Sequence, residues 1–247
     1  MKYKPIIIGI AGTKSSGKDT AASMINYIIN TGVTQADYYT WKEKYNNIHK
    51  FLRIIHFADN LKDMCSKLFN ISRNFFDNEK YKNDYVWSIT HQKFFTREEA
   101  SKLGMKEILI NDLQENGLPI SRRKLNVQGY VSCISIRTIL QYIGTDIFRN
   151  LINPNIWVDL TIDEAKNLAL SSHCIIPDVR FKNECEAIKE INDINTVTIL
   201  IKRNTKFGNP EHESEIIDFN TDYIIKNNDS LMVLFYKLLV ILKEIVK

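Results

Sequence analysis

The chain has 247 residues, of which 44% are hydrophobic, and its formal net charge is +4. This length suits one α/β domain with insertions or two small domains, of which we favour the single domain, and the apolar content is sufficient for a full hydrophobic core. The positive charge is spread along the chain without a long basic tract, so we expect no direct binding of nucleic acid, whereas anionic small molecules fit this charge.

A phosphate-binding loop is predicted near the N-terminus, where the apolar, strand-like run 5–8 leads into residues 9–20. Gly12, the four residues after it, Gly17 and Lys18 have the Walker A spacing. Small residues let backbone N–H groups converge on phosphate oxygens, and the lysine ammonium reaches the outer phosphates. A partly apolar helix follows, and its positive dipole end favours an anion. We expect the phosphate contacts to come from Gly12, Thr13, Lys14, Ser15, Ser16, Gly17, Lys18, Asp19 and Thr20.

The magnesium ligand expected beside such a loop has two candidates. Asp19 stands where many nucleotide hydrolases carry a metal-binding Ser or Thr, and Thr20 comes one residue later. Carboxylate and hydroxyl oxygens both suit Mg²⁺, and a carboxylate can also act through a bound water. The spacing does not decide between these two residues.

A second strand, a helix and a long insertion come next. Residues 52–57 form a short β-type run, and the helical pattern after it puts Lys62 in the first turn, near the sheet edge where α/β proteins bind ligands. A solvated surface lysine is the alternative. Residues 70–132 are charged, aromatic and weakly periodic, so we expect an insertion outside the core, with helices over 96–103 and 106–113.

The helix predicted over 136–149 has two distinct faces. Roughly 120° from its apolar stripe lies a row made of Arg137, Gln141 and Gly144. Gly144 leaves a gap beside Arg137, while Thr145 and Arg149 add a hydroxyl and a second guanidinium. Because arginine suits phosphate recognition, this row is a candidate phosphate site. An ordinary solvated face is the alternative.

A buried strand over 174–179 ends in charged residues. Placed beside the first strand, Asp178 would face the magnesium ion or one of its waters, as a Walker B carboxylate does, and Arg180 would reach the phosphates. Pro177 makes the end of this strand irregular. A structural ion pair between Asp178 and Arg180 is the alternative.

The remaining elements complete an α/β fold. A β-branched run over 197–201 is followed by Arg203, so another strand presents a cation at its carboxyl end. Segment 203–221 lies where a phosphate-covering lid would sit. A short strand over 223–225 and a closing helix over 231–246 follow, and that helix is too short and too charged for a membrane anchor. Strands alternating with helices predict a parallel five-stranded sheet between layers of helices.

In this order, the motifs resemble the phage and large-virus family of deoxynucleoside monophosphate kinases, within the P-loop nucleotide kinases. The resemblance covers nearly the whole chain and is weak only over 31–50 and 83–132. It is carried by the loop 12–20, Phe57-Ala58-Asp59, Leu61-Lys62, Arg137, Gln141, Gly144-Thr145, Arg149, Ile156-Trp157-Val158, Asp178-Val179-Arg180-Phe181, Asn183-Glu184, Arg203, His212, Ser214-Glu215, Asn227 and Ser230-Leu231. Many enzymes share the loop, and the ordered set is what is specific.

That resemblance implies an adenylate-kinase-like P-loop fold and the ATP- and Mg²⁺-dependent phosphorylation of a deoxynucleoside monophosphate, which supplies DNA precursors. It implies catalysis by Lys18, Arg180 and Arg203 and metal binding by Asp19, Thr20 and Asp178. It implies acceptor binding by Lys62, Arg137, Gln141, Gly144, Thr145, Arg149 and Trp157. It also implies one kinase domain over 1–247, with a monophosphate-binding insertion at 70–150 and a lid at 203–221.

Two other functions share part of this pattern. One is another small-molecule P-loop kinase, acting for example on phosphomevalonate or dephospho-coenzyme A, and the other is a nucleotide-binding regulator without transfer activity. The second set of phosphate-directed cations, Lys62, Arg137 and Arg180, favours a kinase, because an ATP switch does not need them.

The cysteines and the absence of targeting signals suggest a compartment. The four cysteines form no CxxC pair and have no histidines at zinc-ligand spacing, so we expect reduced, buried thiols. No export signal or membrane span is visible, which predicts a cytoplasmic protein, in the host cytoplasm if the source is viral. A homodimer is left open.

Overall fold

The computed structural model describes residues 5–13, 15–32, 40–41, 51–111, 113, 132–203 and 217–245. The chain divides into two compact units. Met1–Phe57 and Val158–Lys247 form the first unit, and Ala58–Trp157 forms the second. The second unit contains the predicted insertion 70–150 and extends beyond it at both ends. The organisation as one kinase domain stays a prediction.

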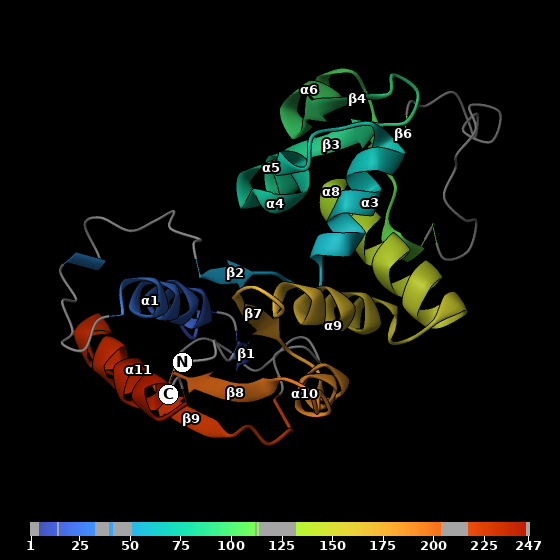
Figure 1. The fold of residues 1–247 in the computed structure, drawn as a ribbon. Coiled ribbons are helices and arrows are strands. Elements are labelled where there is room, and N and C mark those ends of the chain that lie inside the picture. Colours follow the sequence, from blue (N-terminus) through green and yellow to red (C-terminus); the bar gives the residue numbers. More distant parts are fainter. Residues whose placement is uncertain are drawn as a thin grey trace. The chain divides into compact units, whose positions relative to one another are not determined.

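The first unit is built around a five-stranded sheet (Figure 1). Its strands are β1 (Ile6–Ala11), β2 (Leu52–Ile54), β7 (His173–Val179), β8 (Asn195–Lys202) and β9 (Tyr223–Lys226), in the order β2-β7-β1-β8-β9. All four pairings between neighbouring strands are parallel. The predicted parallel five-stranded sheet is therefore confirmed.

Helices cover both faces of this sheet. On one face lie α1 (Lys18–Thr31) and α11 (Leu231–Ile245), whose apolar side chains share a core cluster with the strands. On the other face lie α9 (Ile156–Leu168) and α10 (Lys182–Lys189), which contribute to a second cluster. The result is the predicted three-layer α/β architecture.

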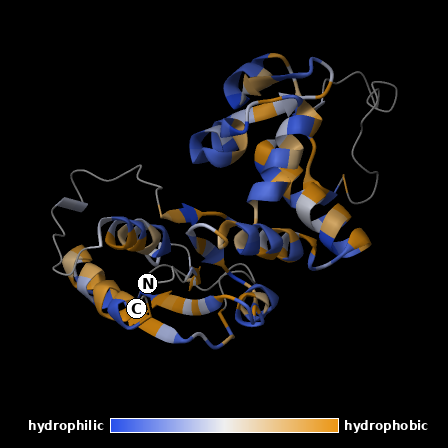
Figure 2. Cartoon of the chain, in the orientation of Figure 1, coloured by the Kyte–Doolittle hydropathy of each residue, from blue (hydrophilic) through white to orange (hydrophobic). Residues whose placement is uncertain are grey.

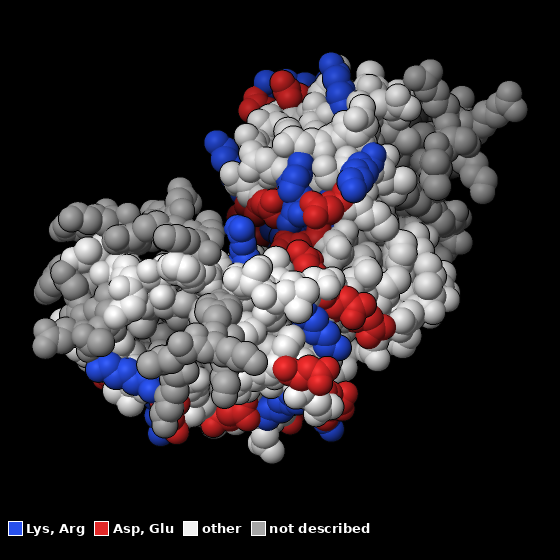
Figure 3. Space-filling view, in the orientation of Figure 1, with Lys and Arg blue, Asp and Glu red and all other residues white. Residues whose placement is uncertain are grey.

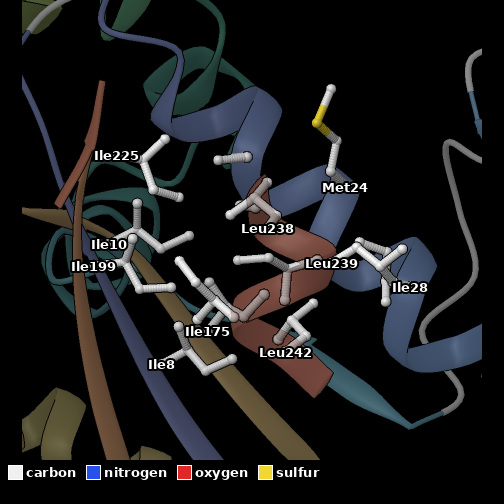
Figure 4. Packing of buried hydrophobic residues seen from close by; sticks show 14 of the residues in the cluster. Ile8, Ile10, Met24, Ile28, Ile175, Ile199, Ile225, Leu238, Leu239 and Leu242 are labelled. Atoms are coloured by element: carbon white, nitrogen blue, oxygen red, sulfur yellow. The ribbon is translucent and has the colours of Figure 1, made fainter. Parts of the chain in front are cut away.

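Strand β1 shows how the sequence produces these layers. All six of its residues are buried, as expected for a central parallel strand that is covered on both faces. Side chains of a strand alternate between faces, so Ile8 and Ile10 point toward α1 and α11, as Figure 4 shows, whereas Ile7 packs with the cluster on the opposite face. Figure 2 shows the same hydrophobic character along the strands and along α11.

The second unit has its own mixed sheet with the strand order β4-β3-β6-β5. Strand β3 pairs antiparallel with β4 and β6, and β5 pairs parallel with β6. In chain order its elements are α3 (Asp59–Phe69), α4 (Asn74–Asp77), α5 (Glu79–Asp84), β3 (Tyr85–Ser88), β4 (Lys93–Thr96), α6 (Arg97–Lys102), β5 (Lys106–Glu107), β6 (Ser132–Ser135), α8 (Ile136–Gln141) and the π-helix η1 (Tyr142–Ile152).

The sequence did not predict that this unit has a sheet and buried hydrophobic clusters of its own, and it differs from the predicted elements at two places. The helix predicted over 96–103 is confirmed as α6, with a capping box at Thr96, but the one predicted from residue 106 begins with strand β5 instead. The single α-helix predicted over 136–149 changes to a π-helix after Gln141.

The four cysteines are all buried and unpaired, which confirms the expected reduced thiols. Within the described part of the chain, no helix combines the length and apolarity needed to cross a bilayer.

Candidate active site

The predicted phosphate-binding loop connects the carboxyl end of β1 to the first turn of α1. Its backbone is left-handed at Ser15 (φ 63°) and at Gly17 (φ 97°), a conformation that residues other than glycine rarely adopt. The N–H of Ser16 donates a hydrogen bond to the carbonyl oxygen of Thr13 at 3.2 Å. The chain therefore turns sharply just before α1, whose N-terminus attracts anions. Lys14, also predicted in this loop, lies outside the described residues.

Two glycines of the loop are required by close contacts. A Cβ atom on Gly12 would lie 2.3 Å from Ser16 Oγ and 3.0 Å from the carbonyl oxygen of Ile201. A Cβ atom on Gly17 would lie 2.5 Å from Asn227 Nδ2. That same amide donates a buried hydrogen bond to the carbonyl oxygen of Ser16 at 2.8 Å. Asn227, which follows β9, thus fixes the loop, a role that no local sequence pattern indicated.

The loop has polar groups that suit the phosphates of a nucleotide. Ser16 is fully buried, and its hydroxyl has no hydrogen-bond partner within the described ranges. Lys18 is only 8% exposed, and a buried ammonium is stabilised by an anion. Asp19 lies exposed in the first turn of α1, and Thr20 beside it is half-buried. The donors therefore fit phosphate oxygens, whereas metal binding by Asp19 or Thr20 stays a prediction.

Asp178 lies in β7, which pairs with β1 in the centre of the sheet. The register shifts where residues 9–11 of β1 face residues 176–179 of β7. Strand β7 thus carries one extra residue there, which is the irregularity predicted at Pro177. The Asp178 carboxylate accepts a hydrogen bond from the N–H of Phe57 at 3.3 Å. Asp178 lies at the carboxyl edge of the sheet, as the phosphate-binding loop does.

Arg180 and Arg203 follow two strands of the same sheet. The backbone N–H groups of Arg180 and Phe181 both donate to one carboxylate oxygen of Glu184, at 2.8 Å and 3.1 Å. Glu184 is buried, so it holds the turn after β7 in place. Arg203 directly follows β8 and is exposed. Residues 204–216, most of the predicted lid, lie outside the described residues.

In the second unit, two of the predicted acceptor-binding cations are paired with carboxylates. The Nζ atom of Lys62, in α3, lies 3.0 Å from a carboxylate oxygen of Asp77, at the end of α4. The Nη2 atom of Arg137, in α8, lies 3.1 Å from a carboxylate oxygen of Glu79, at the start of α5, and 3.4 Å from the side-chain oxygen of Asn83. The hydrogen bond from Lys82 is the main cause of the lowered pKa of Glu79, and the charge of Arg137 adds to it.

Arg73 is a further charged residue that the sequence analysis missed. Its guanidinium contacts three carboxylates, those of Asp59 at 2.6 Å, Asp77 at 3.1 Å and Asp63. It also donates to the backbone carbonyl of Asp59 at 3.3 Å. Because Asp59 and Asp63 belong to α3 and Asp77 to α4, Arg73 ties these two helices together.

The gap predicted beside Gly144 is filled. A Cβ atom on Gly144 would lie 2.5 Å from Cδ2 of Leu61, so this glycine allows η1 to pack closely on α3. The indole N–H of Trp157 donates to the carbonyl oxygen of Gly144 at 2.9 Å, and Trp157 is only 4% exposed. Both residues therefore have a structural role in the unit, and their contact with an acceptor stays a prediction. The other predicted acceptor residues of α8 and η1 are Gln141, Thr145 and Arg149.

The predicted site residues thus fall into two groups. One group lies at the carboxyl edge of the first unit's sheet and comprises 12–20 with Lys14 excepted, Asp178, Arg180 and Arg203. The other group belongs to the second unit and comprises Lys62, Arg137, Gln141, Gly144, Thr145, Arg149 and Trp157.

Known proteins resemble this chain. Residues 6–238 match the family model described as deoxynucleotide monophosphate kinase. A deoxynucleoside-5'-monophosphate kinase of Escherichia phage T5 is 28% identical to the chain over 117 residues, which are 47% of this chain and 38% of that relative. The chain therefore spans well under half the length of this curated relative.

Proposed function

The chain belongs to the deoxynucleotide monophosphate kinase family, and on that premise we propose that it transfers the γ-phosphoryl group of ATP to the phosphate of a deoxynucleoside monophosphate. The products are ADP and the deoxynucleoside diphosphate. The family match over residues 6–238 carries the proposal, because it spans both the phosphate-binding loop and the second unit's cations.

The first unit is proposed to bind ATP. The loop N–H groups and the orphaned hydroxyl of Ser16 would bind the phosphate oxygens, and the buried ammonium of Lys18 would contact the outer phosphates. Arg180 and Arg203 would neutralise charge on the transferring group, since phosphoryl transfer is accelerated mainly by alignment and electrostatic stabilisation. The turn that Glu184 fixes gives Arg180 a defined backbone position for this task.

The second unit is proposed to bind the monophosphate. Lys62 and Arg137 would bind its phosphate, and Gln141, Thr145 and Arg149 would add polar contacts, while Gly144 and Trp157 support η1 from within. No general base is required, because the second pKa of a phosphate monoester is about 6 and the attacking oxygen is already largely ionised at neutral pH.

Magnesium is proposed as the metal. It would neutralise negative charge that builds up between the phosphates, and Asp19, Thr20 and Asp178 would hold it directly or through water. This ion usually takes one or two protein oxygens plus waters and substrate phosphates, so these few residues would be sufficient. Asp19→Ala should shift the magnesium dependence of the rate, and an unchanged titration would assign the metal to Thr20 or Asp178.

The test is to measure ADP formation with the four deoxynucleoside monophosphates and the four ribonucleoside monophosphates as acceptors. ADP should appear only when a deoxynucleoside monophosphate is added, and Lys18→Ala should abolish transfer. ADP release that needs no acceptor would favour a nucleotide-binding regulator with hydrolytic activity. Transfer only to phosphomevalonate or dephospho-coenzyme A would replace the proposed acceptor.

A further inference from the structure

The two cations proposed to bind the acceptor phosphate are both paired with carboxylates from one short stretch of chain. Asp77, the last residue of α4, pairs with Lys62 at 3.0 Å, and Glu79, the first residue of α5, pairs with Arg137 at 3.1 Å. Asn78 alone separates the two carboxylates. Figure 3 shows basic and acidic side chains intermixed on the surface of this unit.

We propose that Asp77 and Glu79 are specificity-determining residues that hold Lys62 and Arg137 while no acceptor is bound, and that the phosphate of the monophosphate displaces them. The proposal rests on the proposed function. We name the stretch from Asp77 to Glu79 the acidic clasp. It would make binding selective, because a ligand must interact with the two cations more favourably than the carboxylates do.

The backbone of the clasp gives its two carboxylates a fixed setting. Asn78 is extended (φ −80°, ψ 122°) between the two helices, and its side chain caps α5 by accepting a hydrogen bond from the N–H of Lys80 at 2.9 Å. The N–H of Asn78 donates to the carbonyl oxygen of Asn74 at 3.1 Å. The junction is therefore held by its own hydrogen bonds, which leaves the side chains of Asp77 and Glu79 able to exchange partners without unfolding it.

The carboxylates keep other partners when a phosphate takes their cations. Asp77 also contacts Arg73 at 3.1 Å, and Glu79 contacts Lys82 at 2.9 Å. A released carboxylate is therefore not left without a counter-charge. This arrangement lowers the cost of the exchange, because isolated like charges near a bound phosphate would repel it.

The charge of a ligand determines whether it can displace the carboxylates from Lys62 and Arg137. The side chains of Arg137 and Glu79 are 61% and 67% exposed, and exposed ion pairs are weak. A phosphate monoester near neutral pH carries close to two negative charges and three acceptor oxygens, and arginine binds such groups in a bidentate manner. A dianionic phosphate therefore competes well with one carboxylate, whereas a deoxynucleoside has no anionic group that could bind either cation.

The pair of Arg137 and Glu79 gives the clearest test. We would measure the dissociation constants of dGMP and dTMP, and of deoxyguanosine and thymidine, by titration calorimetry with the full chain and no ATP. Glu79→Gln keeps the shape of the side chain and removes its charge. We expect it to tighten monophosphate binding by about two- to fivefold, the range that weak exposed pairs imply, and to leave nucleoside binding unchanged.

Two comparisons isolate the pair. In an Arg137→Gln background, Glu79→Gln should have no effect on monophosphate binding, because the proposed phosphate-binding cation is absent and Lys82 is released in both backgrounds. Glu98→Gln is the matched control: it removes another exposed carboxylate, one that pairs with Lys102 in α6 of the same unit, and it should change nothing. Asp77→Asn, tested with Lys62→Gln in the same way, repeats the measurement for the other half of the clasp.

Each alternative result overturns the proposal. Monophosphate binding that Glu79→Gln leaves unchanged or weakens would show that the carboxylate does not compete. An equal gain with the nucleosides, with Glu98→Gln or in the Arg137→Gln background would show a general effect of charge. If the wild-type chain forms ADP with a monophosphate and the variants give any of these results, the proposed function stands and the role proposed for the acidic clasp is wrong. A wild-type chain that binds no monophosphate overturns both.

Discussion

Asn227 and Ser16 lie 211 residues apart in the sequence, and a buried hydrogen bond joins them. The backbone N–H of Asn227 also donates to the carbonyl oxygen of Lys202 at 2.7 Å, which anchors the residue to the end of β8. Asn227 is 4% exposed. The conformation of the phosphate-binding loop thus depends on an amide from the far end of the chain.

Replacing Asn227 by alanine should therefore damage the loop. The carbonyl oxygen of Ser16 would lose its donor inside the protein, which costs about 1–3 kcal/mol for a buried polar group. We expect a lower melting temperature and a higher KM for ATP, with little change in the KM for the monophosphate. Asn227→Asp should be at least as harmful, because it places an acceptor opposite the carbonyl oxygen.

Asn192→Ala is a suitable control for this prediction, since Asn192 is exposed in the first unit. It should leave both the melting temperature and the KM for ATP unchanged. An Asn227→Ala protein with the wild-type KM for ATP would show that the loop keeps its conformation without the hydrogen bond from Asn227 to Ser16.

At this scale, the residues that sequence alone could identify are those whose role depends on their neighbours in the chain. The need for glycine at 12 and 17 was predictable because a loop with the Walker A spacing is one continuous segment. The contacts of Asn227 with Ser16 and of Glu79 with Arg137 were not predictable, because these partners are remote in sequence and only the fold brings them together.

The strands of the first unit were predictable for a related physical reason. A central strand of a parallel sheet is buried on both faces, so its residues are mostly apolar or β-branched, as in β1 and in residues 197–201 of β8. Strands β3 and β4 have four residues each and mix aromatic residues with lysine, threonine and serine. Such short stretches carry too little periodicity to be told from irregular chain, so the second sheet was missed.

The π-helix η1 also escaped the sequence analysis. The predicted helix assumed one α-helical repeat across 136–149, but the helix widens after Gln141, where hydrogen bonds run to the fifth residue instead of the fourth. The polar row inferred from an α-helical repeat therefore does not continue unchanged past α8. Gly144, predicted to border a ligand, instead lies against Leu61.

Gly144→Ala should consequently destabilise the protein. The new methyl group would lie 2.5 Å from Cδ2 of Leu61, and Leu61 is itself packed in the core cluster of the second unit, so it cannot turn away freely. Overpacking of this kind costs about 1–3 kcal/mol. The free energy of unfolding in urea, measured for Gly144→Ala, Leu61→Ala and the double variant, checks this.

The double variant decides the cause. Leu61→Ala should cost less in the Gly144→Ala background than in the wild type, because truncating the leucine relieves the overlap. Strictly additive losses would contradict a direct clash between these two side chains.

On the scale of the whole molecule, each unit has the components of a stable fold. The first contains a five-stranded sheet with core clusters on both faces, and the second contains a four-stranded sheet with two clusters of its own. Smaller folds generally bury a smaller fraction of their surface, and the second unit is the smaller of the two. It should therefore be the less stable of the two, if the units unfold separately.

The cysteines give a way to test this, because each unit contains two of them. Burial raises the pKa of Cys65 and Cys174 to about 12 and that of Cys133 to about 11, and it also raises the pKa of Cys185. An unfolded thiol has a pKa of about 8.5. Since the thiolate is the reactive form, none of the four should be alkylated in the native protein near neutral pH.

Pulses of an alkylating reagent at rising urea concentration, followed by peptide mass spectrometry, would then report the unfolding of each unit. We expect Cys65 and Cys133 in the second unit to become reactive at lower urea than Cys174 and Cys185 in the first. Cys174 and Cys185 share one core cluster and should react together, and Cys65 and Cys133, which lie in the two clusters of the second unit, should do so if that unit unfolds cooperatively. If all four became reactive at one urea concentration, the two units would unfold as one, and the second unit could not be treated as independently stable.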